Sequence, residues 1–396
     1  MIQRTLQRYL RRDVLYYPVL TLTGPRQSGK TTLARETFPE HEYVSLEELD
    51  LRAFAAEDPR GFLQRYRNAV IIDEIQRVPS LFSYIQTKVD AHPTPGQFVL
   101  TGSQNFLLME RVSQSLAGRT AVLHLLPFER AELEGRIRNE ELTGDTLFNS
   151  ANSSLEPWET VYRGYYPRIH DRAIPPEIWL EDYIRTYIER DVRTLINVGD
   201  LASFERFLTL AAGRTGQILN YTSIANDCGI ALDTAKRWMS LLITSFIVFL
   251  LPPHYRNFNK RIIKSPKLYF YDTGLACRLL GVKSADQART YPQRGALFEN
   301  LVVSECFKAY THQRQQPPLY YWRDQTGHEI DLIVEEGDQL YAVEIKSGQT
   351  VSSDMFDTLR WWSTQTGNPP ETTTLVYGGD QTSSRSGIRV CPWSSV

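Results

Sequence analysis

Eight residues near the N-terminus, GPRQSGKT, constrain the fold of this 396-residue chain more than any other stretch. Gly24, Gly29, Lys30 and Thr31 occupy every fixed position of the pattern G-x-x-x-x-G-K-[S/T]. The apolar run Val19–Thr23 comes directly before the pattern, and a helical stretch begins at the lysine. A strand, a glycine-rich turn and a helix in this order predict a phosphate-binding loop at the edge of a parallel sheet.

Each residue of this loop has an expected task. The glycines allow backbone N–H groups to approach phosphates closely, and the positive end of the helix dipole lies beside them. Lys30 is expected to neutralise β- and γ-phosphate oxygens, and the Thr31 hydroxyl to ligate Mg²⁺. We therefore expect ATP–Mg²⁺ to contact the loop and the first helical residues: Gly24, Pro25, Arg26, Gln27, Ser28, Gly29, Lys30, Thr31 and Thr32.

Two further apolar runs end in polar residues that suit ATP hydrolysis. The run Ala69–Ile72 ends in Asp73 and Glu74. Asp73 is expected to hold the Mg²⁺ shell, and Glu74 to polarise the attacking water as a catalytic residue. The other run ends in TGSQN, which would bring Ser103 or Asn105 beside the γ-phosphate. The paired acids favour hydrolysis over phosphate transfer to a metabolite.

Two arginines downstream of these runs are candidates for a role in catalysis. An arginine supplied by a neighbouring subunit can stabilise the charge that develops during phosphoryl transfer. Arg119, in the sequence LAGR, is the first candidate and Arg111 is the second. Such a role implies a homo-oligomer, whereas the alternative for either residue is an ordinary surface arginine.

Sequence phrases along most of the chain resemble one prokaryotic AAA-type ATPase family. They are TGPRQSGKTTL, IIDEIQRVP, LTGSQNF, SLAGR, RGYYPRI, YIERDV, KSPKLYFYDTGL and ALFENLVVSE. A further apolar run at 43–46 separates the two motif-bearing runs, as in additional-strand P-loop ATPases. The resemblance is weakest over about 130–155. It implies an ATPase domain followed by a C-terminal region of unknown function.

The stretch HEIDLIVEEGDQLYAVEIK predicts a β-hairpin about its Gly-Asp turn. A two-residue turn pairs residue 336 with 339 and so sets Asp331 opposite Glu344, with Lys346 on the same face. Opposed carboxylates repel each other unless a cation lies between them. Mg²⁺ or Mn²⁺ would satisfy both, with Lys346 orienting a water or steadying the leaving charge.

This arrangement resembles the restriction-endonuclease-like, PD-(D/E)-x-K, superfamily, although Ile330 stands where the proline would be. In that superfamily an upstream helix supplies a further acid, and Glu299 takes that place here. The resemblance implies a nuclease with Glu299, Asp331 and Glu344 as metal ligands and with Glu344 and Lys346 as catalytic residues. Two alternatives remain: an exposed Glu344–Lys346 pair on an ordinary hairpin, and a nuclease fold that binds without cleaving.

The middle of the chain has the pattern of a winged helix-turn-helix. Two short helices, in NYTSIANDCGI and ALDTAKRWMSLL, precede two β-type runs. Lys236 and Arg237 lie on the second helix and would face DNA or RNA phosphates. A basic stretch between the β-type runs would do the same, with Arg256, Lys260, Arg261, Lys264 and Lys267. The alternative is a module that binds protein.

Composition limits the remaining classes of protein. The net charge of -2 means that any nucleic-acid contact must come from a local patch. The four cysteines show no C-x-x-C spacing, so neither a zinc site nor a disulfide framework is expected, and a cytoplasmic location fits. The longest apolar stretch, Leu241–Leu251, is shorter than the about 20 residues that span a bilayer, so no membrane is expected.

These observations predict an α/β protein in four segments. A P-loop ATPase domain covers 1–135, a linker and helical region 136–200, a winged helix-turn-helix 201–285, and a restriction-endonuclease-like domain 286–396. The expected function couples ATP hydrolysis to nucleic-acid binding or to Mg²⁺/Mn²⁺-dependent cleavage. The alternative is a nucleotide-switched module that recruits protein partners and cuts nothing.

Overall fold

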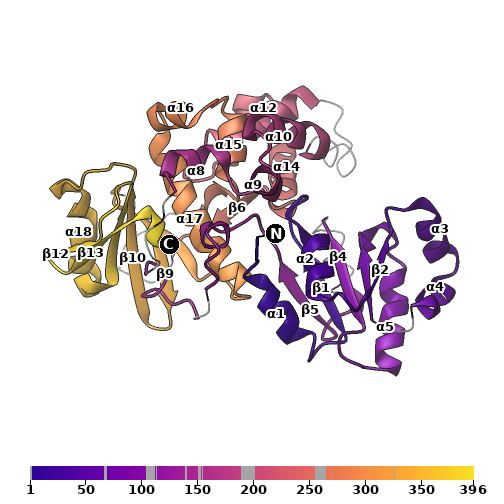
Figure 1. Ribbon diagram of the computed structural model, residues 1–396. Helices are drawn as coiled ribbons and strands as arrows, with labels where there is room; N and C mark the ends of the chain where they lie inside the picture. The colour runs from indigo at the N-terminus through magenta and orange to yellow at the C-terminus, as the bar shows by residue number, and fades with distance from the viewer. Residues whose placement is uncertain are drawn as a thin grey trace. The chain divides into compact units, whose positions relative to one another are not determined.

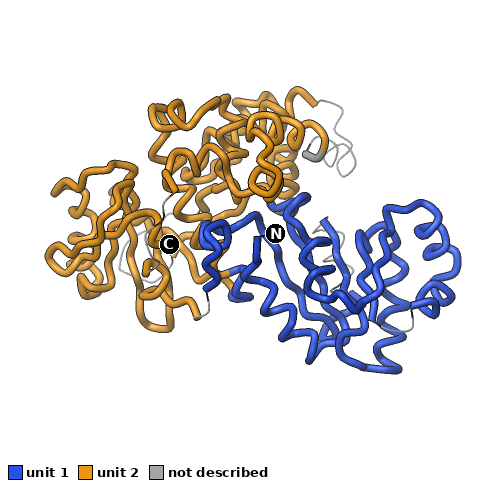
Figure 2. Tube along the Cα trace, viewed as in Figure 1, with its two compact units in different colours: residues 1–139, 244–246, 311–315 blue, residues 140–243, 247–310, 316–396 orange. Residues whose placement is uncertain are grey.

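The computed structural model describes residues 2–66, 69–103, 112, 114–138, 141–149, 153, 155–188, 201–254, 265–324 and 326–396. The chain forms two compact units, coloured separately in Figure 2. Unit 1 comprises residues 1–139, 244–246 and 311–315, and unit 2 comprises 140–243, 247–310 and 316–396. The predicted segment boundaries at residues 200 and 285 fall inside unit 2 and remain predictions.

Unit 1 is built on a five-stranded parallel sheet with strand order β2-β3-β4-β1-β5 (Figure 1). Its strands are β1 (Val19–Thr23), β2 (Glu42–Ser45), β3 (Val70–Asp73), β4 (Phe98–Gly102) and β5 (Thr120–His124). Their apolar runs suit a sheet that is covered on both faces. The additional strand between β1 and β3 is β4, whereas the run at 43–46 forms the edge strand β2.

Helices cover both faces of this sheet. Leu20 and Leu22 point to one face, where they pack with α1 (Leu6–Asp13) and α2 (Lys30–Thr37). Val19 points to the other face, which is covered by α3 (Leu49–Glu57), α4 (Pro59–Arg65) and α5 (Leu81–Ala91). The short elements η1 (Ile75–Arg77) and α7 (Arg130–Leu133) complete the described part of unit 1. Alternation of strands and helices thus gives the predicted parallel sheet, here with helices on both faces.

The first part of unit 2 is helical. It contains α8 (Pro157–Arg163), α9 (Pro167–Asp171), α10 (Pro176–Tyr183), the π-helical η2 (Ile184–Ile188), α12 (Leu201–Ala212), α13 (Tyr221–Cys228), α14 (Leu232–Thr244), α15 (Thr273–Leu279), α16 (Ala285–Thr290) and α17 (Arg294–His312). Asn220 caps α13, and Gly229 ends it with φ of 70°. Two antiparallel strands, β6 (Val248–Leu251) and β7 (Lys267–Phe270), follow α14. Two helices about a glycine, followed by a strand pair, match the predicted order of elements.

A six-stranded mixed sheet with strand order β12-β13-β11-β10-β9-β8 forms the C-terminal part of unit 2. The elements are β8 (Leu319–Arg323), β9 (Glu329–Glu336), β10 (Gln339–Lys346), η3 (Ser353–Phe356), α18 (Asp357–Thr366), η4 (Pro370–Thr372), β11 (Thr373–Tyr377), β12 (Ser383–Arg385), β13 (Ile388–Pro392) and η5 (Trp393–Ser395). Strands β10, β11 and β13 are parallel, and α18 connects the first two. The expected α/β class is therefore confirmed.

The structure also bears on membranes. Among the residues described above, none of the helices combines the length and the apolar character that crossing a bilayer requires.

Candidate functional site

The loop between β1 and α2 depends on its two glycines. Gly24 has φ of 152°, and a Cβ at this position would lie 2.1 Å from the carbonyl oxygen of Leu125. Gly29 has φ of 92° and precedes the first residue of α2. Both backbone conformations favour glycine. Of the other loop residues, Arg26 and Gln27 are half-buried, Pro25 is buried and Thr32 is exposed.

The ammonium group of Lys30 lies within this loop. Its Nζ donates to the carbonyl oxygens of Gly24 at 3.1 Å and Pro25 at 2.7 Å. Burial lowers the pKa of Lys30 to about 8, although Glu74 acts to raise it. The Ser28 hydroxyl oxygen is buried and has no hydrogen-bond partner. A lysine short of negative partners beside an unsatisfied hydroxyl fits a site for phosphate.

Asp73, at the end of β3, accepts hydrogen bonds from three hydroxyl groups. Thr31 Oγ1 donates to it at 3.0 and 3.1 Å, and Tyr43 at 3.1 Å. Thr101 is the third donor. The structure thus brings together the two predicted Mg²⁺ ligands of this site. The sequence did not identify Tyr43 or Thr101, which lie on β2 and β4, the two strands beside β3.

Glu74 has an unusual backbone conformation with φ of 56°, which residues other than glycine rarely adopt. Its carboxylate accepts hydrogen bonds from Gln76 Nε2 at 2.7 Å and from Ser103 Oγ at 3.2 Å. Burial raises the pKa of Glu74, and Lys30 opposes that shift. Ser103 therefore contacts the residue that is expected to polarise water. The alternative γ-phosphate sensor, Asn105, lies outside the described residues.

Arg119 and the phosphate loop lie at opposite ends of the strands of the sheet. It precedes Thr120, which pairs with Val19 at the start of the five-residue strand β1. The loop follows the end of that strand, about 16 Å away at ~3.3 Å per residue. The Arg119 guanidinium pairs instead with Asp90, with Nη2 2.9 Å from Oδ2. Arg119 does not reach the phosphate loop of its own chain, and Arg111 lies outside the described residues.

Arg4 contacts the phosphate loop and was missed by the sequence reasoning. Its guanidinium donates to the backbone oxygens of Ser28 at 3.0 Å and Leu126 at 2.7 Å. It also pairs with Glu132, with 3.0 Å between Nε and Oε2. Arg4 lies two residues before the start of α1, so its buried guanidinium connects that segment to the loop and to the segment after β5. Its partners lie 24 and more than 120 positions away, so no local pattern identifies them.

Glu129, Glu132 and His312 form a buried group within unit 1. In the part of the chain that the structure describes, it is the one set of three acidic, histidine or cysteine side chains whose ligand atoms all lie within 4.8 Å. The Leu126 N–H donates to His312 Nε2 at 3.1 Å, so Nδ1 carries the proton that Glu129 accepts at 2.6 Å. Arg4 supplies the positive charge at Glu132. We interpret the group as a structural network.

The acids predicted for the C-terminal site lie in unit 2, where Lys267 accompanies them. Lys267 Nζ lies 2.9 Å from Glu299 Oε1, 2.5 Å from Glu329 Oε1 and 3.9 Å from Asp331 Oδ1. The Tyr269 hydroxyl donates to Glu299 at 2.5 Å. The expectation that Lys267 faces nucleic-acid phosphates is wrong, because this residue begins β7 and is 1% exposed. The other four basic residues of that stretch lie outside the described residues.

Strands β9 and β10 pair in the register that the sequence predicted, from Glu336–Gln339 to Leu332–Val343. Beyond this last pair, the backbone N–H of Ile345 donates to the Asp331 side chain, to Oδ2 at 2.9 Å. Lys346 donates to Glu344 Oε1, and Glu344 Oε2 is buried without a hydrogen-bond partner.

Burial, with Asp331 as the next cause, raises the pKa of Glu344 to about 8. Because Glu344 is 5% exposed, the alternative of an exposed Glu344–Lys346 surface pair is wrong. Glu344 therefore belongs to a buried acidic site.

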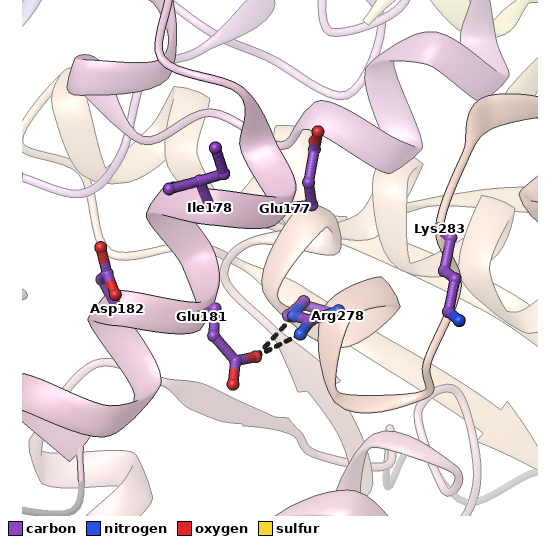
Figure 3. Close-up of a pocket in the computed structure, with 6 residues that line it drawn as sticks. All are labelled: Glu177, Ile178, Glu181, Asp182, Arg278 and Lys283. Carbon is purple, nitrogen blue, oxygen red and sulfur yellow. Dashed lines mark hydrogen bonds and ion pairs between the residues drawn. The ribbon is translucent and has the colours of Figure 1, made fainter.

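A hollow of about 440 Å³ opens elsewhere in unit 2 (Figure 3). Arg278 on α15 and Glu181 on α10 form an ion pair at its wall, with Nε 2.8 Å from Oε2. The other lining residues are Glu177, Ile178, Asp182 and Lys283. None of these residues belongs to a motif, and the arginine is already paired, so we assign the hollow no function.

Three family models match the chain. They are an AAA domain over residues 16–134, a domain of unknown function (DUF8612) over 156–286, and another domain of unknown function (DUF4143) over 294–396. The AAA match and the P-loop sheet support binding and hydrolysis of ATP.

Relatives and solved structures add to this comparison. The uncharacterized proteins Mb2031c of Mycobacterium bovis and Rv2008c of Mycobacterium tuberculosis are each 34% identical over 347 residues, covering 87% of this chain and 73% of the relative. The Walker-type ATPase PABY2304 of Pyrococcus abyssi is 16% identical, covering 70% of this chain and 96% of that one, with a TM-score of 0.43. The RuvB Holliday junction branch migration motor of Thermotoga maritima is 19% identical, covering 62% and 89%, with a TM-score of 0.30.

Proposed function

We propose that this chain, which belongs to the same protein family as Mb2031c and Rv2008c, uses ATP hydrolysis to control nucleic-acid binding by its C-terminal half. The contact of Thr31 with Asp73 beside the buried Lys30 carries the ATPase part of the proposal. Bound Mg²⁺ would neutralise charge on the β- and γ-phosphates. Thr31 and Asp73 would hold it, and backbone N–H groups from Arg26 to Thr32 would bind the phosphates.

Lys30 and Glu74 have separate roles in this proposal. Lys30 exchanges its two carbonyl partners for phosphate oxygens. Glu74, fixed by Ser103 and Gln76, orients the attacking water and accepts its proton. Arg119 acts on the phosphate loop of a neighbouring copy, since it does not reach its own, and this role makes the active form a homo-oligomer.

The ATPase proposal is tested by phosphate release and nucleotide binding measured on the same preparations. Lys30→Ala is expected to lose both, with turnover reduced roughly 100-fold or more. Glu74→Gln is expected to keep ATP binding and lose turnover, by about 100-fold or more. Wild-type turnover in both variants would refute the assigned site.

Nucleic-acid binding is supported by the helix pair α13 and α14. Lys236 and Arg237 are exposed on α14, the second helix of the proposed winged helix-turn-helix. A double Lys236→Ala, Arg237→Ala variant should bind DNA or RNA more weakly, with a smaller salt dependence. Binding should also differ between the ATP-bound and ADP-bound protein. If no nucleic acid binds in either state, the alternative function, recruitment of a protein partner, takes its place.

A second candidate function is Mg²⁺- or Mn²⁺-dependent cleavage of a phosphodiester. The unsatisfied Glu344 Oε2 near Asp331 favours it, because a cation would satisfy both carboxylates. In this candidate Glu299, Asp331 and Glu344 would hold the metal once Lys267 has left Glu299 and Asp331, and Lys346 would orient the water. Single- and double-stranded DNA and RNA are incubated with Mn²⁺ and either wild type or Glu344→Gln. Equal survival of the substrates excludes cleavage.

A further inference from the structure

Three carboxylates surround one buried ammonium in unit 2. Lys267 reaches Glu299 on α17, and Glu329 and Asp331 on β9. The two side chains of the shortest pair, Lys267 and Glu329, are 2% and 24% exposed. Tyr269, two residues along the same strand, donates to Glu299 as well. The lysine and the tyrosine of β7 thus face the acids that the sequence assigns to a metal.

The Lys267 side chain is 2% exposed, and its ammonium has three carboxylates within 4.0 Å. A buried ammonium without such partners would destabilise the fold strongly. The carboxylates therefore keep the lysine buried, and the lysine in turn allows carboxylates of like charge to lie together.

The spacing of the acids differs from that of a closed metal site. Oxygen ligands of one Mg²⁺ lie about 2.1 Å from the ion, and so at most about 4.2 Å from each other. Among the described residues, Glu299, Asp331 and Glu344 do not form a group of three whose ligand atoms all lie within 4.8 Å. Glu299 and Asp331 are instead both within 4.0 Å of Lys267 Nζ.

We propose that Lys267 is the resident cation of this C-terminal cluster and excludes a divalent ion from it. Glu299 and Asp331 bind an ammonium that the chain itself supplies, in place of Mg²⁺ or Mn²⁺. ATP hydrolysis at the phosphate loop does not depend on this arrangement. Metal-dependent cleavage does, because Lys267 must leave the cluster before a metal enters.

The proposal is tested by measuring Mn²⁺ binding to the nucleotide-free full-length chain by calorimetry. Wild type is expected to bind no Mn²⁺ at this cluster, so Asp331→Asn should leave its Mn²⁺ binding unchanged. Lys267→Met is expected to gain one bound Mn²⁺, and adding Asp331→Asn should abolish that gain. Lys283→Met, which removes an exposed lysine outside the cluster, is the matched control and should gain none. Binding by wild type that Asp331→Asn abolishes would overturn the proposal.

A stability measurement in EDTA keeps the test decisive if Lys267→Met does not fold. With Lys267 as the cation, Glu299→Gln removes an attractive partner and must lower the melting temperature. If the acids instead repelled one another around a vacant metal position, neutralising Glu299 would relieve the repulsion and raise the melting temperature. A rise in melting temperature contradicts the proposal, and a fall supports it.

Discussion

The Thr31 hydroxyl lies 3.0 Å from Asp73 Oδ2 and 3.1 Å from Oδ1, so the first turn of α2 is hydrogen-bonded to the end of β3. Both groups are oxygen ligands of the kind that Mg²⁺ prefers. Thr31→Ala removes one of them and should raise the Mg²⁺ concentration needed for half-maximal ATP turnover about tenfold or more. Thr31→Ser keeps the hydroxyl and should stay close to wild type. An unchanged Mg²⁺ requirement in Thr31→Ala would exclude the residue as a ligand.

ATP binding should weaken as the pH rises through about 8, because this is the pKa of Lys30 in the free chain. Phosphate oxygens favour the charged lysine and so raise its pKa in the complex. Binding then takes up a proton between the two pKa values, and affinity is highest below the lower one. Calorimetry in two buffers of different ionisation enthalpy should detect proton uptake at about pH 8.5 and much less at about pH 6.5.

Gly24→Ala should destabilise unit 1 by about 2 kcal/mol or more. The added Cβ would lie 2.1 Å from the backbone oxygen of Leu125, in a backbone conformation that alanine rarely adopts. Gly295→Ala is the matched control, since its Cβ would meet nothing within 4 Å and the residue lies in α17. The control should stabilise its helix by up to about 1 kcal/mol. Urea unfolding of both variants measures the difference.

Arg4→Ala should lower the free energy of unfolding by about 3–5 kcal/mol, because it leaves the buried Glu132 without its ion pair. It also removes the hydrogen bond to the Ser28 carbonyl, so ATP affinity should fall in protein that remains folded. A double-mutant cycle with Glu132→Gln separates the two effects. Compared with Arg4→Ala alone, the double variant should regain part of the lost stability but none of the lost ATP affinity. Additive losses in stability would show that Arg4 and Glu132 do not interact.

The sequence predicted local features of the fold well. The strand at Val19–Thr23, the phosphate loop and the hairpin register from residue 336 all follow from short patterns, in which a turn fixes its neighbours. It did not predict which strand stands beside β1, because strand order depends on contacts between distant residues. It also missed α18, β11 and β13, whose apolar residues are too few and too mixed to show a clear period.

Among the functional residues, too, local patterns could be predicted and contacts between distant residues could not. The contact between Thr31 and Asp73 could be predicted, because both belong to motifs with known spacing. Arg4 and Tyr43 could not, because each meets its partner only after the sheet has formed. Lys267 was placed in a solvent-facing loop on its charge alone, whereas three acids around it make burial possible.

The carbonyl groups of Gly24 and Pro25 give the Lys30 ammonium hydrogen-bond partners within its own loop. Under the proposed function, the lysine would return to these oxygens when the nucleotide leaves, so its charge would keep hydrogen-bond partners. Exchange of ADP for ATP would then change the hydrogen-bond partners of this one side chain.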